Sequence, residues 1–194
     1  ADLDVINPYF RSRQAARELA TLGIKSLIPA GENVHADLPI IIPEIKGAIE
    51  EPEGTLILDV GGDDLGARVL SSLRDAFPQT GYELLLVHNA NRPFTADVKG
   101  TLRVLGEIAA ASRLEFTGLI CNTHMMDSTT AEVVLTGLEL SREVSAAAKL
   151  PIVFLSAVKE VLDKMDPSSI DCPVLPLNRS LLKPWERRAP AGGN

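Results

Sequence analysis

The sequence predicts an α/β protein built on a doubly wound, mostly parallel sheet with helices on both faces. Apolar segments without polar alternation recur along the chain, as at residues 55–59 (TLILD) and 82–88 (YELLLVH). Such segments are typical of strands that are buried on both faces. Segments with helical period lie between them. This alternation of strand and helix indicates parallel strands joined by crossover helices.

The elements can be taken in order along the chain. Residues 1–6 look like the end of a strand, which Asn7-Pro8 breaks. Residues 11–22 have helical period, and Gly23 should end that helix. The segment at 31–43 contains two prolines and is expected to be irregular. Further helices are expected at residues 44–50, 65–77, 95–111, 129–149 and 158–164, and strands at 24–29, 55–59, 82–88, 116–121, 151–155 and 174–177. Thr95 is the expected N-cap of the helix at 95–111.

Composition fits one soluble domain of ordinary size. The chain has 194 residues, of which 45% are hydrophobic and 23% charged, which is enough for a sizeable core. We predict a single domain over residues 1–182 and a loose tail over 183–194. The formal net charge of −7 and the aromatic content of 4% argue against a nucleic-acid partner. Without a signal peptide or an apolar run of membrane-spanning length, we expect a cytoplasmic protein with no membrane contact.

The segment at residues 55–66 (TLILDVGGDDLG) carries the first candidate site. Asp59 would lie at the carboxyl end of its strand, where open α/β sheets bind ligands. Gly61 and Gly62 would allow a sharp turn and a close approach of the backbone to a ligand. The alternative is purely structural, with Asp59 capping the next helix.

Three features together resemble the MinD/ParA/CobQ family of P-loop ATPases over nearly the whole chain. They are the aspartates of Asp2-Leu3-Asp4, the segment Asp59-Val60-Gly61-Gly62 and a later strand that ends at Asn122. The resemblance implies an ATPase that acts as a molecular switch and uses Mg²⁺. It implies that Asp4 lies near the attacking water, that Asp2 lies close to the metal, and that Asp59 is the Walker B carboxylate. Carboxylate oxygens are ligands that Mg²⁺ prefers.

The same resemblance assigns nucleotide contacts and partners. It implies that Gly61 and Gly62 face the terminal phosphate, with the Gly62 backbone N–H as donor. It also implies that Asn7 lies in the first switch segment and that Asn122 reads the edge of the base. The implied partners are the nucleotide and an unidentified client protein, with a homodimer left open.

The phosphate loop of that family does not occur in this sequence. There is no Gly-x-x-x-x-Gly-Lys-Ser/Thr segment, and no glycine directly precedes a lysine. In the family a strand, this loop and a helix come before the aspartate-bearing strand. We therefore expect an amino-terminally truncated chain that binds ATP weakly and is poorly stable. The alternative is a relative that has lost the loop.

Two other functions stay open, a non-catalytic interaction module with the same fold and an ATP-dependent enzyme of the dethiobiotin-synthetase type. Metal-carrying members of the family use closely paired cysteines, whereas Cys121 and Cys172 are far apart in sequence. Cys121 falls in a predicted strand and is expected to be a buried free thiol. The three histidines, His35, His88 and His124, are too dispersed to predict a metal site.

Overall fold

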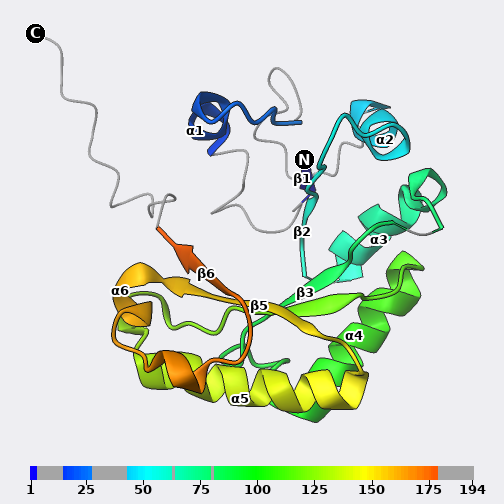
Figure 1. Cartoon of the computed structure of the whole chain (residues 1–194). Coiled ribbons are helices and arrows are strands. Elements are labelled where there is room, and N and C mark those ends of the chain that lie inside the picture. The colour runs from blue at the N-terminus through cyan, green and yellow to red at the C-terminus, as the bar shows by residue number, and fades with distance from the viewer. Residues whose placement is uncertain (4–14, 28–42, 63, 80, 179–194) are drawn as a thin grey trace, which may run out of the picture. The chain divides into compact units, whose positions relative to one another are not determined.

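A computed structural model describes residues 1–3, 15–27, 43–62, 64–79 and 81–178. Within these residues the chain is α/β, with parallel strands in two sheets (Figure 1), so the predicted class and strand direction are confirmed. The chain separates into two compact units. The first unit comprises residues 1–80 and 179–194, and the second unit comprises residues 81–178. The expected irregular segment at 31–42 and the expected tail lie outside the described residues.

The first unit contains a short parallel pair of strands and three described helices. Strand β1 (Asp2–Leu3) pairs with β2 (Asp59–Val60), with Asp2 opposite Asp59. The helices are α1 (Ala16–Thr21), α2 (Pro43–Glu50) and α3 (Asp64–Ser72), and a 3-10 helix follows at Arg74–Ala76. Gly23 has a φ of 76° directly after α1, as the predicted helix stop requires.

The predicted strand at residues 55–59 is wrong in its extent and in its burial. Only Asp59–Val60 form β2, and residues 55–58 have no regular structure. The Ile57 side chain is 74% exposed, and Asp59 is exposed as well. An apolar run is buried on both faces only where neighbouring elements cover it. Within the described part of this unit, β1 is the only strand that pairs with β2.

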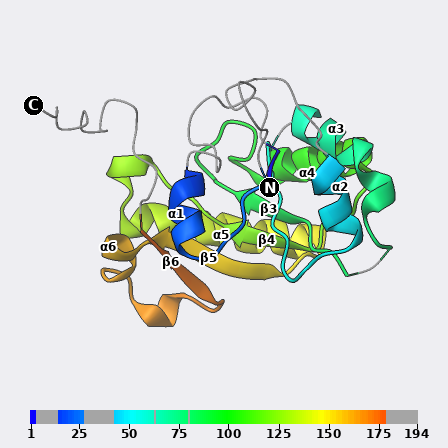
Figure 2. The same cartoon turned by 90° about the horizontal axis from the view of Figure 1, so that it is seen from above.

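The second unit contains a four-stranded parallel sheet in the order β3-β4-β5-β6. Its strands are β3 (Leu85–His88), β4 (Gly118–Cys121), β5 (Ile152–Val158) and β6 (Val174–Leu177). Its helices are α4 (Val98–Ser112), α5 (Ala131–Ala148) and α6 (Lys159–Leu162), with 3-10 helices at Met126–Ser128 and Pro167–Ser169. Figure 2 shows the strands of this sheet from above.

Both long helices of the second unit lie on the same face of its sheet (Figure 1). Strands that follow one another in sequence are also neighbours in the sheet, and right-handed crossovers then place successive helices on one side. Helices α4 and α5 accordingly pack against each other. None of the described helices has the length and apolarity needed to cross a membrane.

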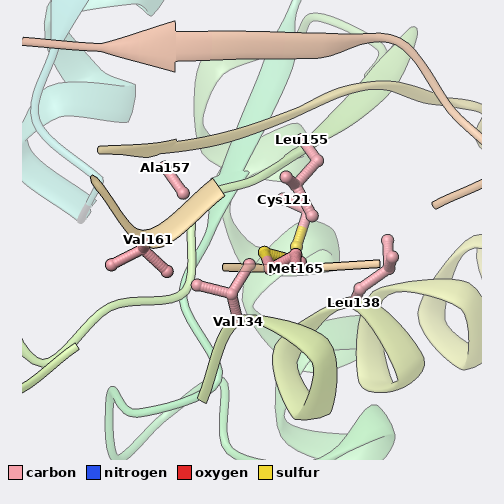
Figure 3. Packing of buried hydrophobic residues seen from close by; sticks show 7 residues of the cluster. All are labelled: Cys121, Val134, Leu138, Leu155, Ala157, Val161 and Met165. Carbon is pink, nitrogen blue, oxygen red and sulfur yellow. The ribbon is translucent and has the colours of Figure 1, made fainter. Parts of the chain in front are cut away.

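Helix α5 packs into two apolar clusters beneath the sheet. One cluster joins β4, β5, α5 and α6 and consists of Cys121, Val134, Leu138, Leu155, Ala157, Val161 and Met165 (Figure 3). The other consists of Leu86, Leu105, Leu119 and Val144. The prediction that Cys121 is a buried free thiol is confirmed.

The start of α4 differs from the prediction by its capping residue. Asp97, not Thr95, is the N-cap, and its Oδ1 accepts a hydrogen bond from the Gly100 backbone N–H at 2.6 Å. The Thr95 hydroxyl instead donates to the Asn89 carbonyl at 2.8 Å. Thr95 therefore closes the loop after β3, and the helix begins three residues later.

Candidate functional site

The two predicted metal ligands, Asp2 and Asp59, are register partners in the parallel pair of the first unit. Register partners on neighbouring strands lie about 5 Å apart and project their side chains to the same face. Asp2 is only 5% exposed, whereas Asp59 is exposed. The pair therefore combines a buried carboxylate with one that solvent can reach, and its negative charge suits a cation.

Contacts at Ala1 tie the start of β1 to residues 57–59. The ammonium donates to the Ile57 carbonyl at 2.7 Å, and the Asp59 backbone N–H donates to the Ala1 carbonyl at 2.8 Å. Burial lowers the pKa of this amino group, while the charges of Asp59 and Asp2 act in the opposite direction. The attraction of the two carboxylates therefore offsets only part of the cost of burying this charge.

The glycines at and after the end of β2 differ in how much room they leave for a side chain. At Gly62 the backbone is outside the left-handed region, and no atom lies within 4 Å of the position of an added Cβ. The position that requires glycine is Gly66 in α3, where a Cβ would lie 2.0 Å from the Gly61 carbonyl oxygen. Close packing of α3 on the Gly61 carbonyl therefore shapes this turn. The signal in the sequence was a third glycine inside a helical segment, where glycine is otherwise unfavourable.

Asn122 lies in the second unit, directly after β4 at the carboxyl edge of the sheet. Its backbone N–H donates to the His88 carbonyl at 2.9 Å, which ties it to β3. Its side-chain Oδ1 accepts a hydrogen bond from the Ser156 hydroxyl at 3.1 Å, which ties it to β5. The residue is half-buried. Its amide is thus held at the edge where parallel sheets bind ligands.

The structure places the predicted site residues in three groups. Asp2 and Asp59 lie side by side, and Gly61 and Gly62 follow β2 directly in the chain. Asn122 belongs to the second unit. Asp4 and Asn7 lie outside the described residues.

A polar connection between the loops after β3 and β4 was not predicted from the sequence. The side-chain amides of Asn89 and Asn91 both donate to the His124 carbonyl at 3.4 Å. The Thr123 hydroxyl accepts from the Ala90 backbone N–H at 3.1 Å. Burial, with a smaller contribution from the Arg92 charge, lowers the pKa of His124. The signal for this connection in the sequence was the pair Asn89 and Asn91, which come just after the strand predicted at 82–88.

His88 is a fully buried residue of the core and not a ligand. Its Nδ1 lies 2.8 Å from the Ser141 hydroxyl and its Nε2 lies 3.0 Å from the Thr95 carbonyl. Burial lowers the pKa of the imidazole, and the hydrogen bond to Thr95 only partly opposes this shift. The ring is therefore neutral at physiological pH, and both its nitrogens are already engaged within the protein.

The chemistry of the donor set allows a two-carboxylate cation site. No group of three or more His, Cys, Asp or Glu side chains among the described residues could hold a metal ion. Mg²⁺ does not need such a group, because it keeps several waters and commonly takes one or two protein carboxylates together with phosphate oxygens. Asp2 and Asp59 meet this smaller requirement. No family model matches the chain, and no curated protein or solved structure matches it.

Proposed function

We propose that the protein is an ATP-binding molecular switch of the P-loop ATPase type, with Mg²⁺ as its cofactor and an unidentified client protein. The proposal includes a doubly wound sheet with helices on both faces. It also includes a cytoplasmic location. The observation that supports it best is the pairing of Asp2 with Asp59 across β1 and β2. Two neighbouring carboxylates can supply the one or two protein oxygens that a nucleotide-bound Mg²⁺ commonly takes.

The two carboxylates would take different roles. Asp59 is exposed and is assigned the contact with the ion, directly or through water. Asp2 is buried beside it on the same face and would be the second carboxylate close to the ion. When bound, the ion would neutralise charge on the β- and γ-phosphates. Asp4 is proposed to lie near the attacking water.

Further nucleotide contacts are proposed for single residues, each described within its own unit. In the first unit, the backbone at Gly61 and Gly62 would meet the terminal phosphate, where the open space beside Gly62 leaves room. Asn7 would belong to the first switch segment. In the second unit, the anchored amide of Asn122 would contact the base. A second copy of the chain is retained as a candidate partner.

Substitution of Asp59 by Asn in the protein expressed from its complete reading frame tests this function. The isosteric change removes the charge that would hold the ion and should raise the dissociation constant of MgATP by about tenfold or more, with a matching loss of hydrolysis. With EDTA present, the variant should bind ATP no more weakly than the wild type, because the lost charge also repelled phosphate.

Glu53→Gln is the matched control, since it neutralises an exposed carboxylate in the same unit. It should leave MgATP binding unchanged. Titration of a fluorescent ATP analogue with and without Mg²⁺ measures all three proteins. No binding by the wild type, or equal effects of the Asp59 and Glu53 substitutions, would overturn the proposal.

A non-catalytic interaction module is the second candidate. It is favoured by three exposed apolar side chains on the loops after β3 and β4, namely Phe94, Met125 and Met126. Exposed aromatic and methionine side chains are common at protein interfaces. This function predicts a client that binds equally well to wild type and Asp59→Asn, and without ATP. The switch function predicts that client binding depends on MgATP.

A further inference from the structure

Asn122 and Ser156 are neighbours at the carboxyl edge of the sheet in the second unit. Cys121 is the register partner of Leu155, so the next residue on each strand brings Asn122 beside Ser156. The Ser156 Oγ lies 3.1 Å from Asn122 Oδ1 and 3.4 Å from the Cys121 carbonyl oxygen. Ser156 is only 5% exposed. A buried hydroxyl thus faces two oxygen atoms of the adjoining strand.

This contact sets the orientation of the Asn122 amide. The hydroxyl has a single proton and donates it in its shorter contact, at 3.1 Å, to Asn122 Oδ1, which therefore turns towards β5. The amide nitrogen of Asn122 has no hydrogen-bond partner within the described part of the chain. It is therefore the group that Asn122 has available for a ligand, and the second lone pair of Oδ1 also remains.

Ser156 also stands out in its strand. It is the only polar residue of β5, whose sequence is IVFLSAV. Burying a hydroxyl is unfavourable unless it finds a partner, and an apolar residue would suit the cluster formed by Leu155 and Ala157. The hydroxyl finds its side-chain partner in Asn122, the residue assigned to the base.

We propose that Ser156 is a positioning residue that fixes the Asn122 amide and thereby sets the preference for adenine over guanine. This inference rests on the proposed function, because it needs a nucleotide to be bound. Adenine presents a donor beside an acceptor on its N6/N7 edge, whereas guanine presents two acceptors, O6 and N7. An amide held in one orientation pairs with the adenine pattern and meets guanine O6 with its own oxygen.

The test compares dissociation constants for Mg²⁺-bound fluorescent ATP and GTP analogues in the protein expressed from its complete reading frame. Wild type should prefer ATP. Asn122→Ala should reduce the ratio of the two constants by about 5- to 150-fold, as expected for loss of a two-point amide–base contact. Ser156→Ala should reduce it by about 2- to 13-fold, the worth of one hydrogen bond. Ser156→Thr, which keeps the hydroxyl, should restore the preference.

Ser112→Ala is the matched control for a purely structural effect. Ser112 is also fully buried, and its hydroxyl accepts from the Leu114 backbone N–H at the end of α4. Both Ser→Ala variants should lower the melting temperature, and only Ser156→Ala should change the nucleotide ratio. If Ser156→Ala does not fold, Ser156→Cys replaces it, with a ratio expected between wild type and Asn122→Ala because the thiol is a weak donor.

The outcomes separate this inference from the proposed function. A wild type that binds neither nucleotide overturns both. A wild type that binds ATP and GTP equally, or an Asn122→Ala variant with an unchanged ratio, overturns the inference and leaves nucleotide binding intact. An unchanged ratio in Ser156→Ala (or in Ser156→Cys where that replaces it), beside a lost preference in Asn122→Ala, overturns the role of Ser156 alone.

Discussion

Gly137 is the residue of α5 where the packing leaves no room for a side chain. An added Cβ would lie 2.2 Å from both Cβ and Oγ1 of Thr123. Thr123 cannot give way easily, because it is buried and accepts the Ala90 backbone N–H. Gly137→Ala should therefore lower the free energy of unfolding by about 1–3 kcal/mol, as overpacked cores do.

Gly106→Ala in α4 is the control for that substitution. Gly106 is exposed, and nothing lies within 4 Å of its added Cβ. The better helix propensity of alanine should raise the free energy of unfolding by up to about 1 kcal/mol. Urea denaturation measures both variants. Equal stability of the two alanine variants would contradict the close approach of α5 to Thr123.

His88 should make stability depend on pH in a defined direction. Its pKa is lowered in the folded protein, so the unfolded chain takes up a proton at a higher pH than the folded one. The contribution of His88 is thus fully present above the unfolded pKa of about 6.5 and is lost as the pH falls below it. His88→Gln should flatten the change in unfolding free energy between pH 7.5 and pH 5.5.

His124→Gln separates His88 from the other histidine whose pKa is lowered. His124 is half-buried, whereas His88 is fully buried, so the larger part of the pH dependence should persist in the His124 variant. Urea melts at pH 5.5, 6.5 and 7.5 give the slopes. A wild-type stability that rises on acidification through this window would refute the argument.

At the level of elements, the start of α4 depends on Asp97. Its carboxylate caps the Gly100 backbone N–H, and N-cap removal typically costs about 0.5–2 kcal/mol. Asp97→Ala should lower the free energy of unfolding by that amount. Asp97→Asn should lower it much less, because asparagine also caps. Thermal and urea unfolding report the difference. Identical losses in the two variants would show that capping is not what Asp97 contributes.

Local pattern was enough to predict many of the elements and was not enough for others. The strand at Val174–Leu177 and the helix over Ala131–Ala148 were predicted closely, since apolar period and flanking caps are local properties. The buried strand at 55–59 failed because burial depends on which elements cover a segment. The Thr95 cap failed because Thr95 and Asp97 are equally suitable in sequence, and the loop after β3 uses the Thr95 hydroxyl.

The candidate site was predictable in residue type and not in geometry. Asp2 and Asp59 were both expected near a metal, but their pairing depends on the register of two strands far apart in the chain. Ser156 gave only a weak signal, a single hydroxyl within an apolar strand. Its contact with Asn122 follows from a register shift between β4 and β5 after Leu119, which sequence alone does not reveal.

At the scale of the whole described chain, the proposed site residues lie in two units, and the two units hold them in different ways. The second unit surrounds α5 with two apolar clusters, and its site residues are held by hydrogen bonds from neighbouring strands. In the first unit the carboxylate pair rests on a ladder of two residues per strand.

The strand order of the second unit has a consequence for how the protein folds. Each strand pairs with the next one made, so a contact such as Thr117 with Leu84 closes a loop of 33 residues. The contact of Ala1 with Ile57 in the first unit closes 56 residues. Shorter closures cost less chain entropy and favour faster folding. The sheet that carries Asn122 can thus be assembled strand by strand in the order of synthesis, and each of its strand pairings closes a shorter loop than the pairing of Asp2 with Asp59.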